Sequence, residues 1–214
     1  MVEIIPAILS TTSQDFERRL RLLEPFTDRI HLDVADGSFT STVTVRGFDE
    51  LIKFPTAKKW DIHFMIRQPE QVMHDWYKTS ADRFIFHVEV NHALRGLIEE
   101  AHLNGKKAGV AINPETPIET LEEILEFVDF VQFMTVHPGA QGNPFLPEVV
   151  DKISMFHEQH PEVHVIADGG INPDTGPRTA IAGAQTLVVG SYIFGSPSVQ
   201  EAFDHLQALQ VFGG

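Results

Sequence analysis

The stretch "RIHLDVADGSFT", residues 29–40, contains one of eight short β-rich runs that alternate with helical segments, and it brings polar side chains into an apolar run. Successive side chains of a strand point to opposite faces, so His31 and Asp33 share one face. A buried carboxylate is costly unless it is paired or bound to a metal. We therefore expect a partner group or a metal ion beside Asp33.

The alternation of β-rich runs with segments of helical period determines the expected fold. Several runs are nearly continuous in apolar residues, as expected when both faces of a sheet are covered. Over 214 residues the pattern predicts an α/β protein with one (β/α)₈ TIM barrel spanning residues 1–214, and an open doubly wound sheet is the alternative. The expected strands cover residues 3–9, 29–34, 58–66, 83–90, 106–112, 130–136, 163–167 and 186–190. The expected helices cover residues 13–26, 69–78, 92–105, 117–128, 145–160, 174–184 and 198–209, with a long loop over 37–50.

Composition excludes several classes of partner and site. The formal charge of -14 argues against nucleic acid and against anionic membranes as partners. With no cysteine, the chain has no disulfide and no thiolate metal site, so a metal would need His, Asp or Glu ligands. The first residues lack the pattern of a signal peptide, and no apolar run reaches the length of a membrane span. We expect a soluble, cytoplasmic protein.

Four polar side chains fall at the carboxyl ends of the expected strands, where barrel active sites lie. They are His31, Asp33, His63 and Asp168. A single histidine at such a position is more often a hydrogen-bonded core residue than a ligand. Four side chains that converge by topology favour a metal, and two imidazoles with two carboxylates fit one divalent ion of zinc, iron, manganese or cobalt.

Three glycine-containing segments follow the last three expected strands. They are "VHPGAQGNPF" (136–145), "DGGIN" (168–172) and "VVGSYIF" (188–194). Barrels often bind phosphate with the loops after strands seven and eight, where backbone N–H groups approach the ligand. The sequence therefore predicts a phosphate site that includes Gly169, Gly170, Gly190 and Ser191.

These residues lie in a series of motifs that resembles the ribulose-phosphate 3-epimerases. The motifs occur in order as "PAILS", "HLDVADG", "DIHFM", "GVAINPETP", "MTVHPGAQGNPF", "ADGGIN" and "VVGSYIF", and they span nearly the whole chain. The resemblance implies a ribulose-phosphate-binding type of barrel, a ketose-phosphate substrate and a homo-oligomer. It implies a metal held by His31, Asp33, His63 and Asp168. It further implies a phosphate held by Gly142, Gly169, Gly170, Gly190 and Ser191.

The resemblance also implies a reaction, the interconversion of D-ribulose 5-phosphate and D-xylulose 5-phosphate. Inverting the carbon beside a ketone requires removal of its proton and return of a proton from the opposite face, through an enediolate. Asp33 and Asp168 would be the acid and base, and the metal would stabilise the developing charge. Met65 and Met134 would form an apolar wall that limits water around the reacting carbon.

Several residues depart from the family pattern. Ala7, Ala35, Ser38 and Ala140 replace residues that usually surround the substrate, and Gln141 stands where the usual Gly-Phe-Gly-Gly-Gln has glycine. Phe64 and Phe133 are bulky enough to refill some of that space. A change of this kind can redirect specificity, so a hexulose 6-phosphate such as D-allulose 6-phosphate is an alternative substrate.

Two further alternatives belong to other functional classes. A non-catalytic sugar-phosphate-binding barrel would keep the phosphate site, but it would not need the acid/base pair. An orotidine-phosphate decarboxylase would resemble a pattern with Lys between two Asp residues, which the segment Asp33-Val34-Ala35-Asp36 lacks. His87 is expected to be a core histidine that borders the site, and His137 either contacts substrate or caps a loop.

Overall fold

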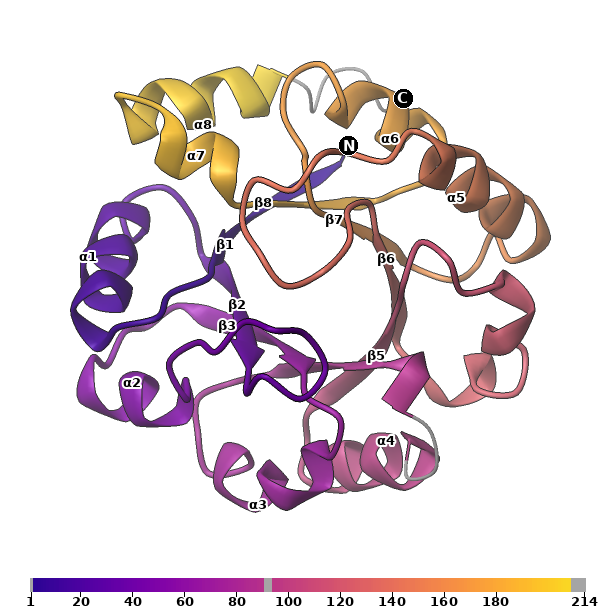
Figure 1. Cartoon of the computed structure of the whole chain (residues 1–214), viewed down its shortest axis with the longest axis horizontal. Coiled ribbons are helices and arrows are strands. Elements are labelled where there is room, and N and C mark those ends of the chain that lie inside the picture. The colour runs from indigo at the N-terminus through magenta and orange to yellow at the C-terminus, as the bar shows by residue number, and fades with distance from the viewer. Residues whose placement is uncertain (1, 91–93, 209–214) are drawn as a thin grey trace.

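The computed structural model describes residues 2–90 and 94–208, and within them eight parallel strands close into a barrel (Figure 1). Each strand pairs with the next, and β1 pairs with β8 to complete the closure. The barrel prediction is therefore confirmed and the open sheet is excluded. The strands are β1 Glu3–Ile8, β2 Arg29–Ala35, β3 Lys59–Met65, β4 Arg83–His87, β5 Lys107–Ile112, β6 Phe130–Met134, β7 Val165–Asp168 and β8 Thr186–Val189.

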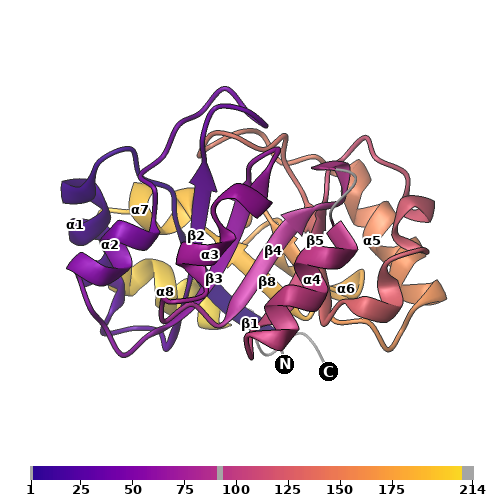
Figure 2. The same cartoon turned by 90° about the horizontal axis from the view of Figure 1, so that it is seen from below.

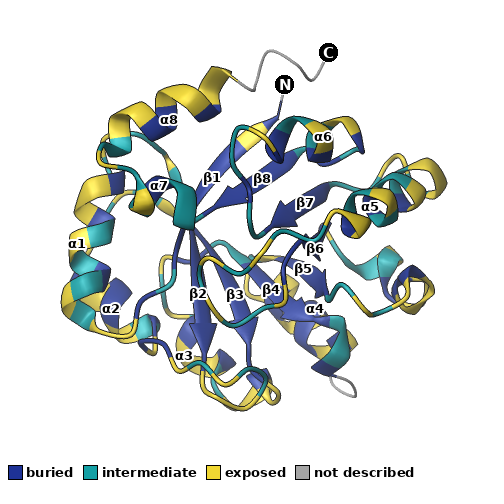
Figure 3. Cartoon of the chain, turned by 45° about the horizontal axis from the view of Figure 1, so that its top comes forward, coloured by how far each residue is buried: buried dark blue, intermediate teal, exposed yellow. Residues whose placement is uncertain are grey.

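Helices surround the barrel and turn their exposed faces outward (Figure 3). The α-helices are α1 Ser13–Leu23, α2 Phe48–Lys53, α3 Met73–Trp76, α4 Leu94–Leu103, α5 Glu148–Gln159, α6 Gly176–Ile181, α7 Ser191–Gly195 and α8 Val199–Gln207. Short 3₁₀ helices are η1 Pro69–Gln71, η2 Val88–Val90, η3 Ile118–Leu121 and η4 Leu125–Phe127. No helix in residues 2–90 and 94–208 is both long and apolar enough to cross a membrane.

The structure differs from the sequence prediction in three connections. The helix expected over 117–128 is replaced by η3 and η4, and the buried side chains of this segment, Ile118, Leu121 and Ile124, recur every three residues, which is the period of a 3₁₀ helix. Residues 37–50 are not all loop, since α2 begins at Phe48, and α7 was not predicted. Residues 92, 93 and 209 of the expected helices lie outside the described residues, as do the two ends of the expected domain.

The core has two parts, one between strands and helices and one inside the barrel. Phe16 and Trp60 stack in the outer part, with ring centroids 5.8 Å apart. Phe64 and Phe133 also belong to the outer part, where Phe133 packs on Phe156, so the prediction that they refill the substrate pocket is wrong. Alternation along β3 and β6 explains this, because Met65 and Met134 point inward and their neighbours must point outward. The inner part contains Ala7, Ile85, Ala111, Phe130, Met134, Ile166 and Val188.

Strand register brings the predicted polar residues to one end of the barrel. Asp33 of β2 lies opposite His63 of β3, and Met134 of β6 lies opposite Asp168 of β7. The loops that follow β2 and β6 rise above this end (Figure 2). They also touch, since the Thr42 hydroxyl donates a hydrogen bond to the carbonyl oxygen of Gly139. The site therefore lies beneath two connected loops.

Candidate active site

Two histidines and two aspartates form a buried cluster at the carboxyl ends of β2, β3 and β7. One donor atom from each of His31, Asp33, His63 and Asp168 lies within 4.8 Å of the others. His63 Nδ1 is 3.0 Å from Asp33 Oδ1 and 3.5 Å from Asp168 Oδ2. His31 Nε2 is 3.4 Å from Asp33 Oδ1 and 3.6 Å from Asp168 Oδ2. The four side chains predicted from separate strands thus converge on one point.

The cluster fits a divalent metal ion. Both imidazoles are fully buried, yet neither ring nitrogen of His31 has a hydrogen-bond partner among the described residues. A buried polar atom without a partner is costly, and a bound cation would satisfy Nε2 beside the two carboxylates. Two nitrogen and two oxygen donors are compatible with zinc, iron, manganese or cobalt. These donors therefore meet the requirements of a metal centre.

Burial and charge move the ionisation of the two carboxylates in opposite directions. Burial opposes ionisation of Asp33, but the neighbouring imidazoles of His31 and His63 outweigh this effect and hold the pKa of Asp33 well below its usual range. Burial and the neighbouring Asp33 charge raise the pKa of Asp168 to about 6. Environments that separate the pKa values of two carboxyl groups suit them to different proton-transfer roles.

His31 is shifted toward its charged form in the same cluster. Burial lowers its pKa, but the carboxylates of Asp33 and Asp168 outweigh this effect and raise it to about 9. In the protein without metal, the imidazolium of His31 therefore compensates part of the negative charge. A metal ion that binds His31 must displace this proton.

A chain of hydrogen bonds behind the cluster fixes the orientation of the His63 ring. His63 Nε2 is 2.9 Å from His87 Nε2, and His87 Nδ1 is 3.1 Å from Glu89 Oε2. Burial, together with the nearby His63, lowers the pKa of His87 to about 4, so its ring is neutral. Donation from His87 Nδ1–H to Glu89 then makes His87 Nε2 the acceptor for His63. This leaves His63 Nδ1 facing Asp33.

Glu89 is itself held in place, and it was missed from the sequence. Its Oε1 accepts hydrogen bonds from the Asn113 backbone N–H at 2.8 Å and from the Thr116 hydroxyl at 2.6 Å. The sequence signal was "FHVEV", which places a carboxylate two residues after a strand-end histidine. His87 is therefore a core histidine, as expected, with a defined contact to the cluster.

Gln132 is a second residue that sequence reasoning missed. Its side chain is fully buried inside the barrel, and its Nε2 donates to Asp168 Oδ2 over 2.9 Å. It lies two residues before Met134 on the inward face of β6, so an amide in the apolar run "FVQFM" was the available signal. Gln132 fixes the position of one Asp168 oxygen.

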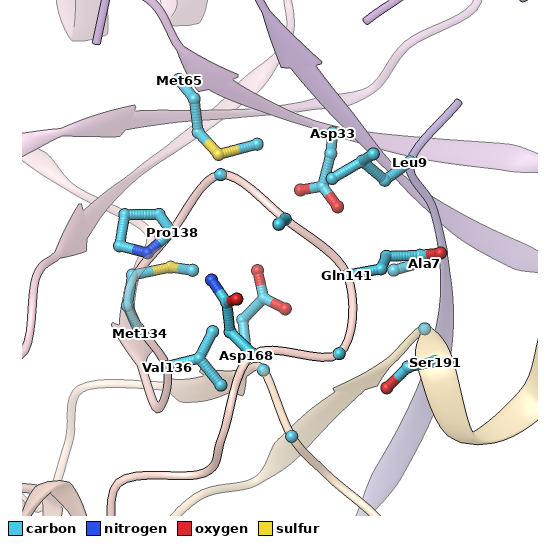
Figure 4. Close-up of a pocket in the computed structure, with 17 residues that line it drawn as sticks. Ala7, Leu9, Asp33, Met65, Met134, Val136, Pro138, Gln141, Asp168 and Ser191 are labelled. Atoms are coloured by element: carbon cyan, nitrogen blue, oxygen red, sulfur yellow. The ribbon is translucent and has the colours of Figure 1, made fainter. Parts of the chain in front are cut away.

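A pocket opens directly above the cluster, and the glycine loops line it (Figure 4). Asp33 and Asp168 reach it from different strands, with Met65 and Met134 on one side. Gly169 has a φ of 114°, and a Cβ there would lie 2.4 Å from Val136, so only glycine fits. The pocket brings together all of the residues predicted for the phosphate, namely Gly142, Gly169, Gly170, Gly190 and Ser191.

With this geometry established, comparison with known proteins identifies the family. The model of the ribulose-phosphate 3 epimerase family matches residues 3–194. The chain belongs to this family. It is 36% identical over 210 residues to a ribulose-phosphate 3-epimerase of Synechocystis sp., covering 94% of this chain and 91% of the relative. It is 31% identical over 214 residues to that of Bacillus subtilis, covering 97% and 99%.

Solved structures extend the likeness of fold to other enzymes. A 3-hexulose-6-phosphate synthase has a TM-score of 0.72 at 16% identity, covering 97% of this chain and 99% of its own. An orotidine 5'-monophosphate decarboxylase from Sulfolobus solfataricus has a TM-score of 0.63 at 12% identity, covering 99% and 98%. At these identities the likeness concerns the barrel fold alone.

Residues that depart from the family pattern fall into two groups. Ala7 and Ala140 line the pocket, whereas Ala35 and Ser38 are absent from its lining among the described residues. Ser38 instead bonds to Asp36, which accepts the Ser38 backbone N–H at 2.8 Å in a turn. His137 also points elsewhere, since its Nδ1 lies 2.6 Å from Glu115 Oε1 on an exposed edge.

Proposed function

We propose that this chain is a metal-dependent 3-epimerase that interconverts D-ribulose 5-phosphate and D-xylulose 5-phosphate. The observation that carries the proposal is the pair of carboxylates, Asp33 and Asp168, facing one pocket within a cluster suited to a metal. Membership of the family supports the isomerase class, and the glycine loops in the same pocket support a phosphorylated substrate.

Inversion at C3 requires removal of a proton from one face and delivery of a proton to the other. Asp33 is ionised and suited to accept the C3 proton at a carboxylate oxygen. Asp168, whose pKa is raised to about 6, is more readily protonated and suited to deliver a proton to the opposite face. The roles exchange in the reverse direction, and Gln132 holds one Asp168 oxygen during both steps.

The metal would be held by His31, Asp33, His63 and Asp168. When bound, it would supply Lewis-acid stabilisation of the negative charge that develops on the substrate oxygens. His87 keeps Nδ1 of His63 directed toward the other donors through its contact with Nε2. Met65 and Met134 provide an apolar wall that limits water near the reacting carbon.

The substrate phosphate would bind at the glycine end of the pocket. Gly142, Gly169, Gly170, Gly190 and Ser191 offer closely approachable backbone there. D-Allulose 6-phosphate or a related hexulose 6-phosphate is a second candidate, favoured by the small side chains of Ala7 and Ala140 in the lining. We also propose that the protein is a cytoplasmic homo-oligomer. Light scattering of the purified protein would measure the mass of the assembly.

Proton exchange in D₂O tests the proposed reaction directly. The metal-loaded protein is incubated with D-ribulose 5-phosphate, and the C3 proton is followed by NMR. We expect the C3 proton signal to disappear as D-xylulose 5-phosphate forms. After treatment with a chelator, neither the exchange nor the epimer should be observed. Exchange without the epimer would mean that one proton-transfer face is misaligned. If neither D-ribulose 5-phosphate nor a hexulose 6-phosphate exchanges its C3 proton, the remaining hypothesis is a non-catalytic sugar-phosphate-binding protein.

A further inference from the structure

Gln141 places an unpaired amide nitrogen at the glycine end of the pocket. It belongs to the loop between β6 and α5, and its Nε2 is buried without a hydrogen-bond partner among the described residues. A Cβ added to Gly190 would lie 2.9 Å from this nitrogen, so the amide sits directly over the backbone after β8. Figure 4 shows Gln141 beside Ala7, at the end of the pocket that also contains Ser191.

Arg19 of α1 fixes which end of this amide faces the pocket. Its Nη1 donates to Gln141 Oε1 over 2.9 Å, and its Nε lies 2.7 Å from Asp15 Oδ2. The guanidinium also stacks over the Phe194 ring of α7, 4.5 Å from the centroid. Because a guanidinium only donates hydrogen bonds, it must bind the amide oxygen, and the NH₂ group then points toward Gly190.

The pocket carries negative charge, so a hydrogen-bond donor is needed there to bind a phosphate. Its lining contains the carboxylates of Asp33 and Asp168, and none of its described residues is Lys or Arg. A phosphorylated ligand therefore meets no cation in direct contact at the glycine end. Arg19 binds the oxygen of the Gln141 amide, and its charge polarises the amide toward stronger donation from the nitrogen.

We propose that Gln141 binds the phosphate of the substrate through its Nε2–H group and that Arg19 is a positioning residue for this contact. The inference rests on the proposed sugar-phosphate substrate, and it adds a side-chain donor to the backbone groups of the glycine loops. It makes recognition of the phosphate depend on α1, an element that contributes none of the cluster ligands.

Four single variants and one double variant test the contact. Gln141→Ala removes the donor, and Gln141→Glu keeps an acceptor for Arg19 while replacing the NH₂ group by an acceptor. Arg19→Met removes the positioning contact. Arg18→Met is the matched control, because Arg18 also pairs with Asp15, at 2.7 Å, but is largely exposed and is not a partner of Gln141. Melting temperatures verify that each variant is folded.

Calorimetry with inorganic phosphate and steady-state kinetics with D-ribulose 5-phosphate provide the measurements. For Gln141→Ala we expect the Kd of phosphate and the KM of the sugar phosphate to rise about tenfold, with kcat within about threefold. Gln141→Glu should raise both by about 100-fold, because it adds a like charge. Arg19→Met should raise them about three- to tenfold in the wild-type background and have no effect in the Gln141→Ala background. Arg18→Met should match the wild type.

Other results would overturn the inference. Wild-type protein that does not bind phosphate, or a Gln141→Ala variant within twofold of wild type in both constants, excludes the contact. Equal losses of kcat/KM for D-ribulose and D-ribulose 5-phosphate would assign Gln141 to loop packing instead. The proposed reaction and the proposed contact can fail separately. If phosphate binding depends on Gln141 but no C3 exchange occurs, the epimerase activity is contradicted and the contact is supported.

Discussion

Two charged clusters lie at opposite ends of β2 and β3, and they differ in how completely their members are paired. At the start of these strands, Asp61 is fully buried but binds Arg29 and lies 3.5 Å from Arg83. Arg29 also lies 2.9 Å from Asp82, whose other oxygen accepts the Trp60 backbone N–H. Each charge in this lower cluster has an opposite charge in contact.

The upper cluster of His31, Asp33, His63 and Asp168 is arranged differently. It has two carboxylates and no Lys or Arg, and His31 has no hydrogen-bond partner among the described residues. Paired buried charges are costly to break but do no chemistry, whereas incompletely paired groups remain available for a ligand. Burial alone therefore does not distinguish the two clusters; the His31 nitrogens without a hydrogen-bond partner and the lack of a Lys or Arg beside the carboxylates mark the upper one.

The largest effect should come from Asp168→Asn in the upper cluster. Removing an acid/base group that is also a proposed metal ligand should lower kcat by about 10³-fold or more, without a large loss of stability. Initial rates with D-ribulose 5-phosphate and a thermal melt measure the two quantities. Asp174→Asn, an exposed position in the following loop, should retain wild-type rates. Full activity of Asp168→Asn would exclude the role of Asp168.

The lower cluster should respond in the opposite way. Asp61→Asn removes the fully buried carboxylate that two partly buried guanidinium groups share, so we expect a loss of about 3 kcal/mol in the free energy of unfolding. Turnover of the folded fraction should stay within about threefold of wild type. Urea denaturation gives the stability, and Asp28→Asn, at an exposed carboxylate beside Lys58, is the matched control. A loss of activity at wild-type stability would show that Asp61 contributes to catalysis rather than to stability.

Stability of the metal-free protein should fall as pH rises from about 6.5 to about 9. His31 has its folded pKa raised to about 9, so the folded state binds more protons than the unfolded state across this interval. The contribution is complete below the unfolded pKa and is lost above the folded pKa, and it amounts to about 3 kcal/mol. Asp168 acts in the same direction at lower pH. Because its pKa is raised to about 6 in the folded state, its contribution to stability falls as pH rises from about 4 to 6 and stays low above that.

Denaturation of the metal-free protein at a series of pH values measures this dependence. His31→Gln should flatten the curve above pH 6.5, and metal loading should do the same because a coordinated imidazole carries no titrating proton there. A metal-free wild type whose stability is constant between pH 6.5 and 9 would contradict the assignment of a charged His31.

The smallest effect should come from Glu89→Gln, behind the upper cluster. This change weakens the carboxylate that holds His87, and through it His63, so the metal dissociation constant should rise about tenfold. Competition with a chromophoric chelator measures the constant independently of turnover. Glu99→Gln, which removes one member of an exposed ion pair on α4, should leave it unchanged. An unaltered constant in Glu89→Gln would remove His87 and Glu89 from the support of the metal site.

Sequence by itself determined the barrel and the members of the upper cluster. Strand alternation assigned His31 and Asp33 to one face, and a parallel barrel brings all strand ends to one rim. The motifs around His63, Asp168 and the glycine loops then identified the family. These features are local or follow from topology, so they could be predicted from the order of residues.

Tertiary structure alone decided the contacts between distant side chains. Arg19 and Gln141 are 122 residues apart, and Gln132 and Asp168 are 36 apart, so no local pattern pairs them. It also decided that Ala7 faces the pocket while Ser38 does not. The physical reason is that such contacts depend on the register of the strands, the path of the loops and the competition between possible hydrogen-bond partners. These are fixed only when the barrel closes.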